Sequence, residues 1–198
     1  MRHYFLILLF AFISCTNTKE QRQKIIVIQP LGDFNIKQSK SVFNKIKTIN
    51  PNVVLRQNIP FPENAYYQPR NRYRADSIIK TIKNNIGKDS VIVGLSNRDI
   101  SVTKGKIKDW GVMGLGYHPG KSCVVSDFRL SQQNKSQQFY KVVLHELGHT
   151  EGLPHCPVKT CLMRDAEGKN HMDEETDFCL KCKNFLIEKG WKLNNPVT

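Results

Sequence analysis

The strongest chemical signal in the sequence is a short run that contains three histidines and a glutamate. His145 and His149 are four residues apart, so on a helix their imidazoles project from the same side and can converge on one metal ion. Gly152 can take the left-handed conformation that turns the chain sharply after such a helix, which lets His155 reach the same ion. Three neutral nitrogen ligands leave zinc one open position for water, as in catalytic rather than structural sites.

Glu146 directly follows the first of these histidines and is predicted to be the general base. Zinc lowers the pKa of its bound water toward neutrality, and Glu146 can accept the proton as the water attacks a polarised peptide carbonyl. The same carboxyl group later returns the proton to the leaving amine. A bare H-E-x-x-H also occurs by chance, but this run adds the glycine and the third histidine at fixed offsets. The sequence therefore predicts a zinc-dependent metallopeptidase.

The elongated motif followed by a methionine is the signature of the metzincin peptidases, and Cys161-Leu162-Met163 supplies that methionine. The chain also resembles the archaemetzincins, a metzincin subfamily, in His155-Cys156, in Cys161 to Met163 and in Cys179-Leu180-Lys181-Cys182. The resemblance covers most of residues 24–190. One departure is the spacing, because fifteen residues separate Met163 from Cys179, about two fewer than expected in the family.

This resemblance implies site residues beyond the three histidines. Met163 is expected in a turn beneath the catalytic metal. A second, structural zinc is expected as well, which gives two zinc ions per chain. Its ligands by resemblance are Cys156, Cys161, Cys179 and Cys182.

The four cysteines also have interpretations that need no family. Their C-x4-C and C-x2-C pairs suit tetrahedral thiolate coordination of zinc. In an oxidising compartment they could instead form two disulfides, and Cys179 with Cys182 could be a redox pair. We favour zinc, largely because of the resemblance. Cys123, inside a predicted strand, is expected to be a buried thiol.

The order of the expected strands and helices around these residues indicates an α/β fold. A strand, helix, strand, helix, strand order over residues 25–95 indicates a mainly parallel sheet covered by helices. Gly87 is expected to cap the second helix. We expect a metzincin-like zincin domain with a twisted, mixed five-stranded sheet, an antiparallel edge strand, an active-site helix and a C-terminal helix. The further segments are a hairpin of 111–117 and 122–125, the active-site helix from about Ser136, and the C-terminal helix from Phe178 to near Gly190.

The predicted edge strand has a functional interpretation that follows from the resemblance. In metzincins this strand forms the upper rim of the cleft, and a peptide substrate pairs with it through main-chain hydrogen bonds. Gly114, Leu115 and Gly116 lie at the expected position, and glycines allow close approach of a substrate backbone. An ordinary edge strand with glycine bulges is the alternative. His118 and His171 are expected to be exposed loop residues.

The N-terminus resembles a bacterial lipoprotein signal. Its apolar run, Phe5 to Ile13, is too short to span a bilayer comfortably but suits an export signal. Cys15 would be the lipidated residue, although Phe12 departs from the usual Leu or Val; a plain cleaved signal is the alternative. We expect a lipid-anchored protein of the bacterial cell envelope, facing the periplasm or the surface. The expected divisions are a signal peptide over 1–14, a polar tether over 15–23 and a metzincin-like catalytic domain over 24–198.

The composition fits a single globular domain with a strong positive charge. The 198 residues are 39% hydrophobic and 24% charged, and the formal net charge is +13. No nucleic-acid-binding motif accompanies the basic residues, whose densest cluster is Arg70, Arg72 and Arg74. An anionic membrane surface, an acidic substrate or a merely solvated basic surface explains the charge better. We expect a monomer that binds peptide or protein substrates and no nucleic acid.

Two rival functions belong to other classes of protein. The first is a non-catalytic, zinc-stabilised peptide-binding protein on the same scaffold. Glu146 argues against it, since a binding module needs no base beside an open metal. The second is a thiol–disulfide oxidoreductase built on Cys179 and Cys182. Metal content separates the oxidoreductase from the peptidase.

Overall fold

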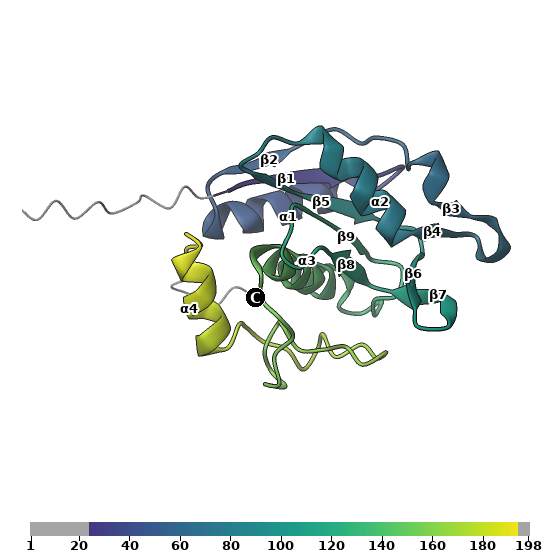
Figure 1. The fold of residues 1–198 in the computed structure, drawn as a ribbon. Helices are drawn as coiled ribbons and strands as arrows, with labels where there is room; N and C mark the ends of the chain where they lie inside the picture. The colour runs from purple at the N-terminus through teal and green to yellow at the C-terminus, as the bar shows by residue number, and fades with distance from the viewer. Residues whose placement is uncertain (1–23, 194–198) are drawn as a thin grey trace, which may run out of the picture.

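A mixed five-stranded sheet forms the centre of the computed structural model, which describes residues 24–193 (Figure 1). The strand order is β2-β1-β5-β9-β8; the first four strands are parallel, and β8 pairs antiparallel with β9. The expected sheet with one antiparallel edge strand is confirmed. The bounds are β1 Ile25–Pro30, β2 Val53–Leu55, β5 Ser90–Ser96, β8 Gly114–Gly116 and β9 Ser122–Ser126.

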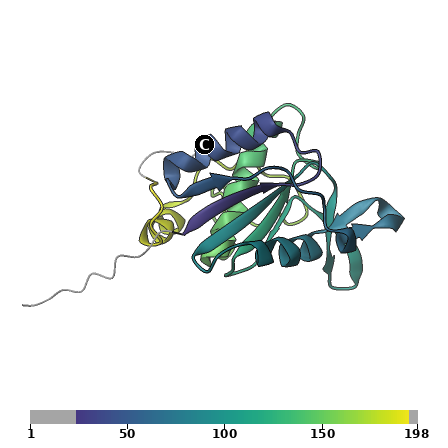
Figure 2. The same ribbon diagram turned by 90° about the horizontal axis from the view of Figure 1, so that it is seen from above.

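Helices cover both faces of this sheet (Figures 1 and 2). Side chains alternate along a strand, so Ile26 and Ile28 of β1 join the core with α1, α3 and α4, whereas Val27 joins the core with α2. Both faces of the central strands are therefore buried, which explains their continuous apolar runs. The helices are α1 Ile36–Ile49, α2 Ala75–Ile82, α3 Lys135–Glu151 and α4 Leu180–Glu188.

The second helix is shorter than its apolar stripe indicates. α2 ends at Ile82 and continues as the 3-10 helix η3, Lys83–Asn85. Gly87 has no left-handed backbone conformation, so its assignment as a helix cap is wrong. Two further 3-10 helices are η1, Glu63–Ala65, and η2, Gln68–Arg70.

A second sheet, of order β3-β4-β6-β7, was not expected from the sequence. The segment 111–117, expected as one strand, is divided between β7 and β8 at Met113. Arg72 of the basic cluster pairs with Asp99 at 2.6 Å and with Asp109 at 2.8 Å. This part of the basic cluster is therefore neutralised within the fold. The bounds are β3 Tyr66–Tyr67, β4 Arg72–Arg74, β6 Ile100–Lys104 and β7 Ile107–Val112.

Residues 156–177, here called the lower segment, run beneath α3 without helix or strand of their own (Figure 1). A row of polar side chains on one face of α3 holds this segment in place. Lys141 is buried and donates from Nζ to the carbonyl oxygens of Met172, at 2.7 Å, and Glu175, at 2.5 Å. The other contacts of the row are Asn134 with Asp173, Gln138 with Asn170 and His145 with the Leu162 carbonyl.

The predictions for residues 1–23 concern a part of the chain outside the described residues. The signal peptide, the tether and the lipidation of Cys15 therefore stay predictions. Among residues 24–193, none of the helices combines the length and the apolar character needed to cross a bilayer.

Candidate metal centre and cleft

The three predicted histidines converge at one point. Their ligand nitrogens all lie within 4.8 Å of one another, and Nε2 of His145 is 3.0 Å from Nε2 of His149. Nitrogens bound to one tetrahedral zinc at about 2.0–2.1 Å lie roughly 3.3 Å apart. His155 completes the group and is more exposed than the other two. The arrangement fits a metal ion with three protein ligands.

Hydrogen bonds fix which ring nitrogens face the centre. Nδ1 of His145 lies 2.7 Å from the Leu162 carbonyl oxygen, and Nδ1 of His149 lies 2.7 Å from the Leu153 carbonyl oxygen. A carbonyl accepts but never donates, so each Nδ1 carries the proton and each Nε2 keeps a free lone pair. Metal-bound histidines commonly have this arrangement.

The end of α3 explains how the third histidine returns to the centre. Gly152 has a φ of 106°, a left-handed conformation, and its N–H donates to the His149 carbonyl. The chain therefore turns directly after the helix. Met163 is buried against α3, where a Cβ on Gly148 would lie 2.6 Å from the Met163 sulfur. The methionine thus supports the helix at the turn between His145 and His149.

Burial sets the charge state of these groups. It lowers the pKa of His145 to about 3, with a further decrease from the charge of His149, and lowers that of His149 to about 4. Both imidazoles are neutral over most of the pH range, as metal ligands must be. Burial also raises the pKa of Glu146 to about 8. The buried Glu146 therefore holds its proton to a higher pH than an exposed glutamate does.

The carboxylate of Glu146 lies directly beneath the edge strand β8. A Cβ on Gly114 would lie 2.4 Å from Oε1 of Glu146, and one on Gly116 would lie 3.1 Å from Oε2. These glycines therefore make room for Glu146, which is a reason that the sequence interpretation did not consider. Leu115 points to the other face and packs with the core around α2.

A cavity of about 730 Å³ adjoins this centre, with β6, β7 and β8 above and the lower segment below. Its apolar wall contains Val112, Met113, Val142 and Met172. The unpaired edge of β8 belongs to the same opening, since β8 is an edge strand of its sheet. The cavity therefore combines an apolar wall, a strand edge and the three histidines.

Two residues of the cavity were missed by the sequence analysis. His118 is exposed as expected, but it lines the cavity, and its ring lies edge-on to that of His149 at 5.6 Å between centroids. Arg129 also lines the cavity and is held by Asp99 at 2.7 and 2.9 Å. The position of His118 directly after the rim strand is the signal that could have indicated it. His171, expected to be exposed, is half-buried.

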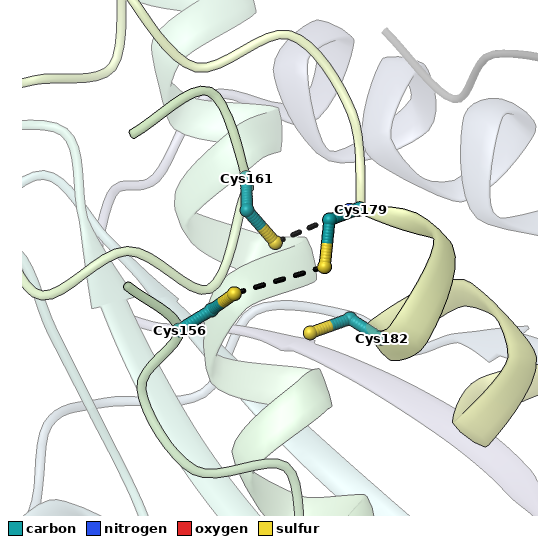
Figure 3. A group of neighbouring side chains, drawn as sticks. All are labelled: Cys156, Cys161, Cys179 and Cys182. Carbon is teal, nitrogen blue, oxygen red and sulfur yellow. Dashed lines mark hydrogen bonds between the residues drawn. The ribbon is translucent and has the colours of Figure 1, made fainter. Parts of the chain in front are cut away.

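The four predicted cysteines form a second cluster (Figure 3). Their sulfurs lie within 4.8 Å of one another, and the Cys156 and Cys179 sulfurs are 3.7 Å apart. A disulfide requires about 2.05 Å, whereas thiolates on one tetrahedral zinc are roughly 3.8 Å apart. Cys161 also accepts a hydrogen bond from the Cys179 N–H at 3.2 Å. The donor set fits a closed, four-cysteine zinc site.

Comparison with known proteins assigns the chain to a family of peptidases. The sequence profile of Peptidase family M54 matches residues 27–188 of the chain. The chain belongs to this family. It is 31% identical to the archaemetzincin of Methanopyrus kandleri over 137 residues, which cover 67% of the chain and 76% of that protein. The archaemetzincin of Halobacterium salinarum is 29% identical over 174 residues, which cover 81% and 98%.

Solved structures of the M54 family show the same fold. The crystal structure of the Methanopyrus kandleri archaemetzincin matches with a TM-score of 0.71 at 24% identity, covering 84% of this chain and 96% of that one. That of the Archaeoglobus fulgidus archaemetzincin, complexed with malonate, matches with a TM-score of 0.69 at 26% identity, covering 81% and 98%. The predicted archaemetzincin resemblance is confirmed, and this M54 chain is a zinc metallopeptidase.

Proposed function

We propose that the chain hydrolyses peptide bonds at the three-histidine centre, with Glu146 as general base. The observation that carries the proposal is the position of the Glu146 carboxylate. It lies between the histidines on its own helix and the open edge of β8, where a peptide backbone can pair. Zinc held by His145, His149 and His155 would act as a Lewis acid that polarises the peptide carbonyl and lowers the pKa of water.

The chain's own groups then perform the proton transfers. Glu146 accepts a proton from the attacking water and returns it to the leaving amine, so that it acts first as general base and then as general acid. The neutral imidazoles of His145 and His149 are held by backbone carbonyls, so they need no rearrangement to bind the metal. No covalent intermediate with the protein is required.

We further propose a second zinc at the four cysteines, so that the chain binds two ions. The spacing of the sulfurs supports this assignment over disulfides. The same cluster fastens the start of α4 to the lower segment, because two ligands come from each. The peptide-binding alternative gives no role to a buried carboxyl group beside an open metal position, and we do not favour it.

A direct test compares the wild-type chain with Glu146→Ala. Elemental analysis should find two zinc ions in both proteins, and both should unfold at similar temperatures. The wild type should cleave members of a broad peptide library, and the variant should be slower by roughly 10²–10⁴-fold. Equal rates for the two proteins would remove Glu146 from the mechanism. Two bound zinc ions without any cleavage would favour the peptide-binding alternative.

A further inference from the structure

The cavity is strongly asymmetric about the metal centre. On one side it ends near His118 and Pro154, close to the surface. On the other side, here called the deep side, it continues past Val142 of α3 and beneath the hairpin β6–β7. The register of that hairpin places Val102 opposite Trp110, so both side chains project from the same face, the one that lines the cavity.

At the far end of the deep side, here called the closed end, the floor of the cavity contacts its roof. Gly168 of the lower segment has a φ of 80°, and a Cβ there would lie 3.2 Å from the Trp110 ring. Gly114 lies over Glu146, and Trp110 lies four residues earlier along the chain, which places it at most about 13 Å away. A substrate strand beside this rim therefore meets the closed end after at most about four residues.

The position of Glu146 decides which part of a substrate enters the deep side. Oε1 of Glu146 points to Gly114, the end of β8 nearer to the deep side. His149 and His118 lie at the other end of the strand, where the cavity opens to the surface. Because Glu146 hands its proton to the leaving amine, the leaving fragment occupies the deep side. In peptide hydrolysis this is the carboxy-terminal fragment of the substrate.

The closed end carries two exposed basic side chains, Lys104 and Lys169. Nζ of Lys104 lies over the Trp110 ring, 5.0 Å from its centroid, and Lys169 directly follows the contact at Gly168. Within residues 24–193, no hydrogen bond or ion pair is found for Nζ of either lysine. Glu167 is an acidic group of the same loop. The other charged groups of the lining have partners: Arg129 with Asp99, Arg164 with Glu174, and Asp165 with His155. Besides the hydrogen bond from the Glu167 N–H, the charge of Lys104 also acts on Asp165 and helps to lower the pKa of that carboxyl group.

We propose that this enzyme removes short carboxy-terminal fragments, of up to about four residues, and that Lys104 and Lys169 bind the terminal carboxylate. The proposal rests on the proposed peptidase function and adds the class of substrate. A closed end without charge would favour any short fragment, whereas ammonium groups that make no hydrogen bond within the described residues select an anion. An acidic side chain also carries a carboxylate group. However, a cavity that ends about four residues from Glu146 favours the carboxylate at the end of the substrate chain.

The test uses zinc-loaded full-length chain and synthetic peptides of ten residues, with products identified by mass. One peptide has a free carboxylate, a second has a carboxy-terminal amide, and a third has the amide with a glutamate as last residue. We expect fragments of at most about four residues that include the original carboxy terminus. The amide should lower kcat/KM by about tenfold or more, as expected when a charge-assisted contact is lost. Recovery of the rate by the glutamate would assign the site to acidic side chains and overturn the terminal-carboxylate proposal.

Variants of the lysines connect this preference to the closed end. Lys104→Gln with Lys169→Gln should remove most of the discrimination between acid and amide. Lys106→Gln is the matched control, because Lys106 is exposed at the turn of the same hairpin and does not line the cavity. Cleavage inside the peptide, with long fragments on both sides, would overturn the proposal. Release of short fragments from the amino terminus would overturn it as well.

A binding measurement separates this proposal from the proposed function. Tetrapeptides with a free or amidated terminus are titrated into zinc-loaded Glu146→Ala protein, and tryptophan fluorescence is recorded, since Trp110 lines the closed end. Tighter binding of the acid, lost in the lysine double variant, supports the carboxylate site even if wild type cleaves no peptide. Equal binding of acid and amide contradicts the site even if wild type is an active peptidase.

Discussion

The histidine and cysteine clusters are built from adjacent residues but face different surroundings. His155 and Cys156 are neighbours in the sequence, yet the histidine is exposed at the cavity while the cysteine joins three sulfurs packed beside α4. Three nitrogens leave a metal position open, and four sulfurs close it. Two adjacent residues thus belong to two different centres, one suited to catalysis and the other suited to stabilising the fold.

The two clusters also differ in the direction in which burial shifts the pKa values of their ligands. Burial lowers the pKa of His145 and His149, so these ligands are ready to bind a metal at neutral pH. Burial raises the pKa of Cys161 to about 11 and that of Cys182 further, so these thiols ionise at neutral pH only when a cation replaces the proton. On the proposed assignment, zinc uptake by the cysteines releases protons and should weaken as the pH falls.

The largest expected effect is at the cysteine cluster. Replacing Cys179 and Cys182 by serine should remove one zinc and lower the unfolding temperature strongly, because binding energy at a structural zinc site is folding energy. Elemental analysis and thermal unfolding measure both effects. Cys123→Ala is the matched control: this buried thiol lies outside the cluster, so the variant should keep two zinc ions. A wild-type chain with one zinc and two disulfides would contradict the assignment.

At the histidine cluster, His149→Ala should separate activity from folding. The variant should lose the other zinc and all measurable hydrolysis, because one of three protein ligands is gone. Its unfolding temperature should fall far less than that of the cysteine variant, since the open site is not expected to hold the lower segment. Elemental analysis, peptide hydrolysis and thermal unfolding test this contrast. Equal destabilisation at both clusters would show that the comparison is wrong.

A smaller effect is expected in the segment that joins the clusters. Glu175 is fully buried, and its carboxylate oxygens have no hydrogen-bond partner among the described residues. Burial raises its pKa from 4.5 to about 7. The unfolded chain therefore releases this proton from about pH 4.5 upward, and the folded chain keeps it until about pH 7, so stability decreases between these values.

Glu175→Gln should remove this decrease. At pH 8 the variant should be more stable than wild type by about 1–3 kcal/mol, and at pH 4 the two should be similar. Denaturant unfolding across this pH range measures the difference, in which the contributions of other groups cancel. Glu188→Gln, at an exposed position of α4, is the control and should follow the wild-type curve. A constant difference at every pH would rule out titration as the cause.

The smallest expected effect is at His118, beside the histidine cluster. Its ring lies close to that of His149 and lines the cavity, so it is placed to donate a hydrogen bond to a bound substrate. His118→Ala should lower kcat/KM by up to about tenfold, as for loss of one hydrogen bond, while both zinc ions stay bound. His118→Gln, which keeps a donor, should recover part of the rate. Loss of zinc in either variant would instead make His118 a ligand.

Sequence reasoning predicted the parts of the fold that depend on local spacing. The central strands are continuous apolar runs, and the helical positions of His145, Glu146 and His149 follow from one motif. The hairpin β6–β7 was missed because lysines interrupt its apolar positions, and its pairing depends on partners such as Arg72 with Asp109. The place of His118 depends on the packing of the rim strand against α3. Such contacts between distant segments leave no periodic signal in the sequence.

The polar row along α3 has a consequence for how new specificities could arise. Because Gln138, Lys141 and His145 fasten the floor of the cleft to the helix that carries the metal ligands, most changes in the floor would also disturb the catalytic geometry. Asp165 contacts the metal ligand His155 at 3.3 Å, but the loop of residues 166–169 lies outside these contacts and lines the end of the cavity. Changes in this loop alone could therefore alter substrate preference among relatives while the geometry of the metal ligands stays the same.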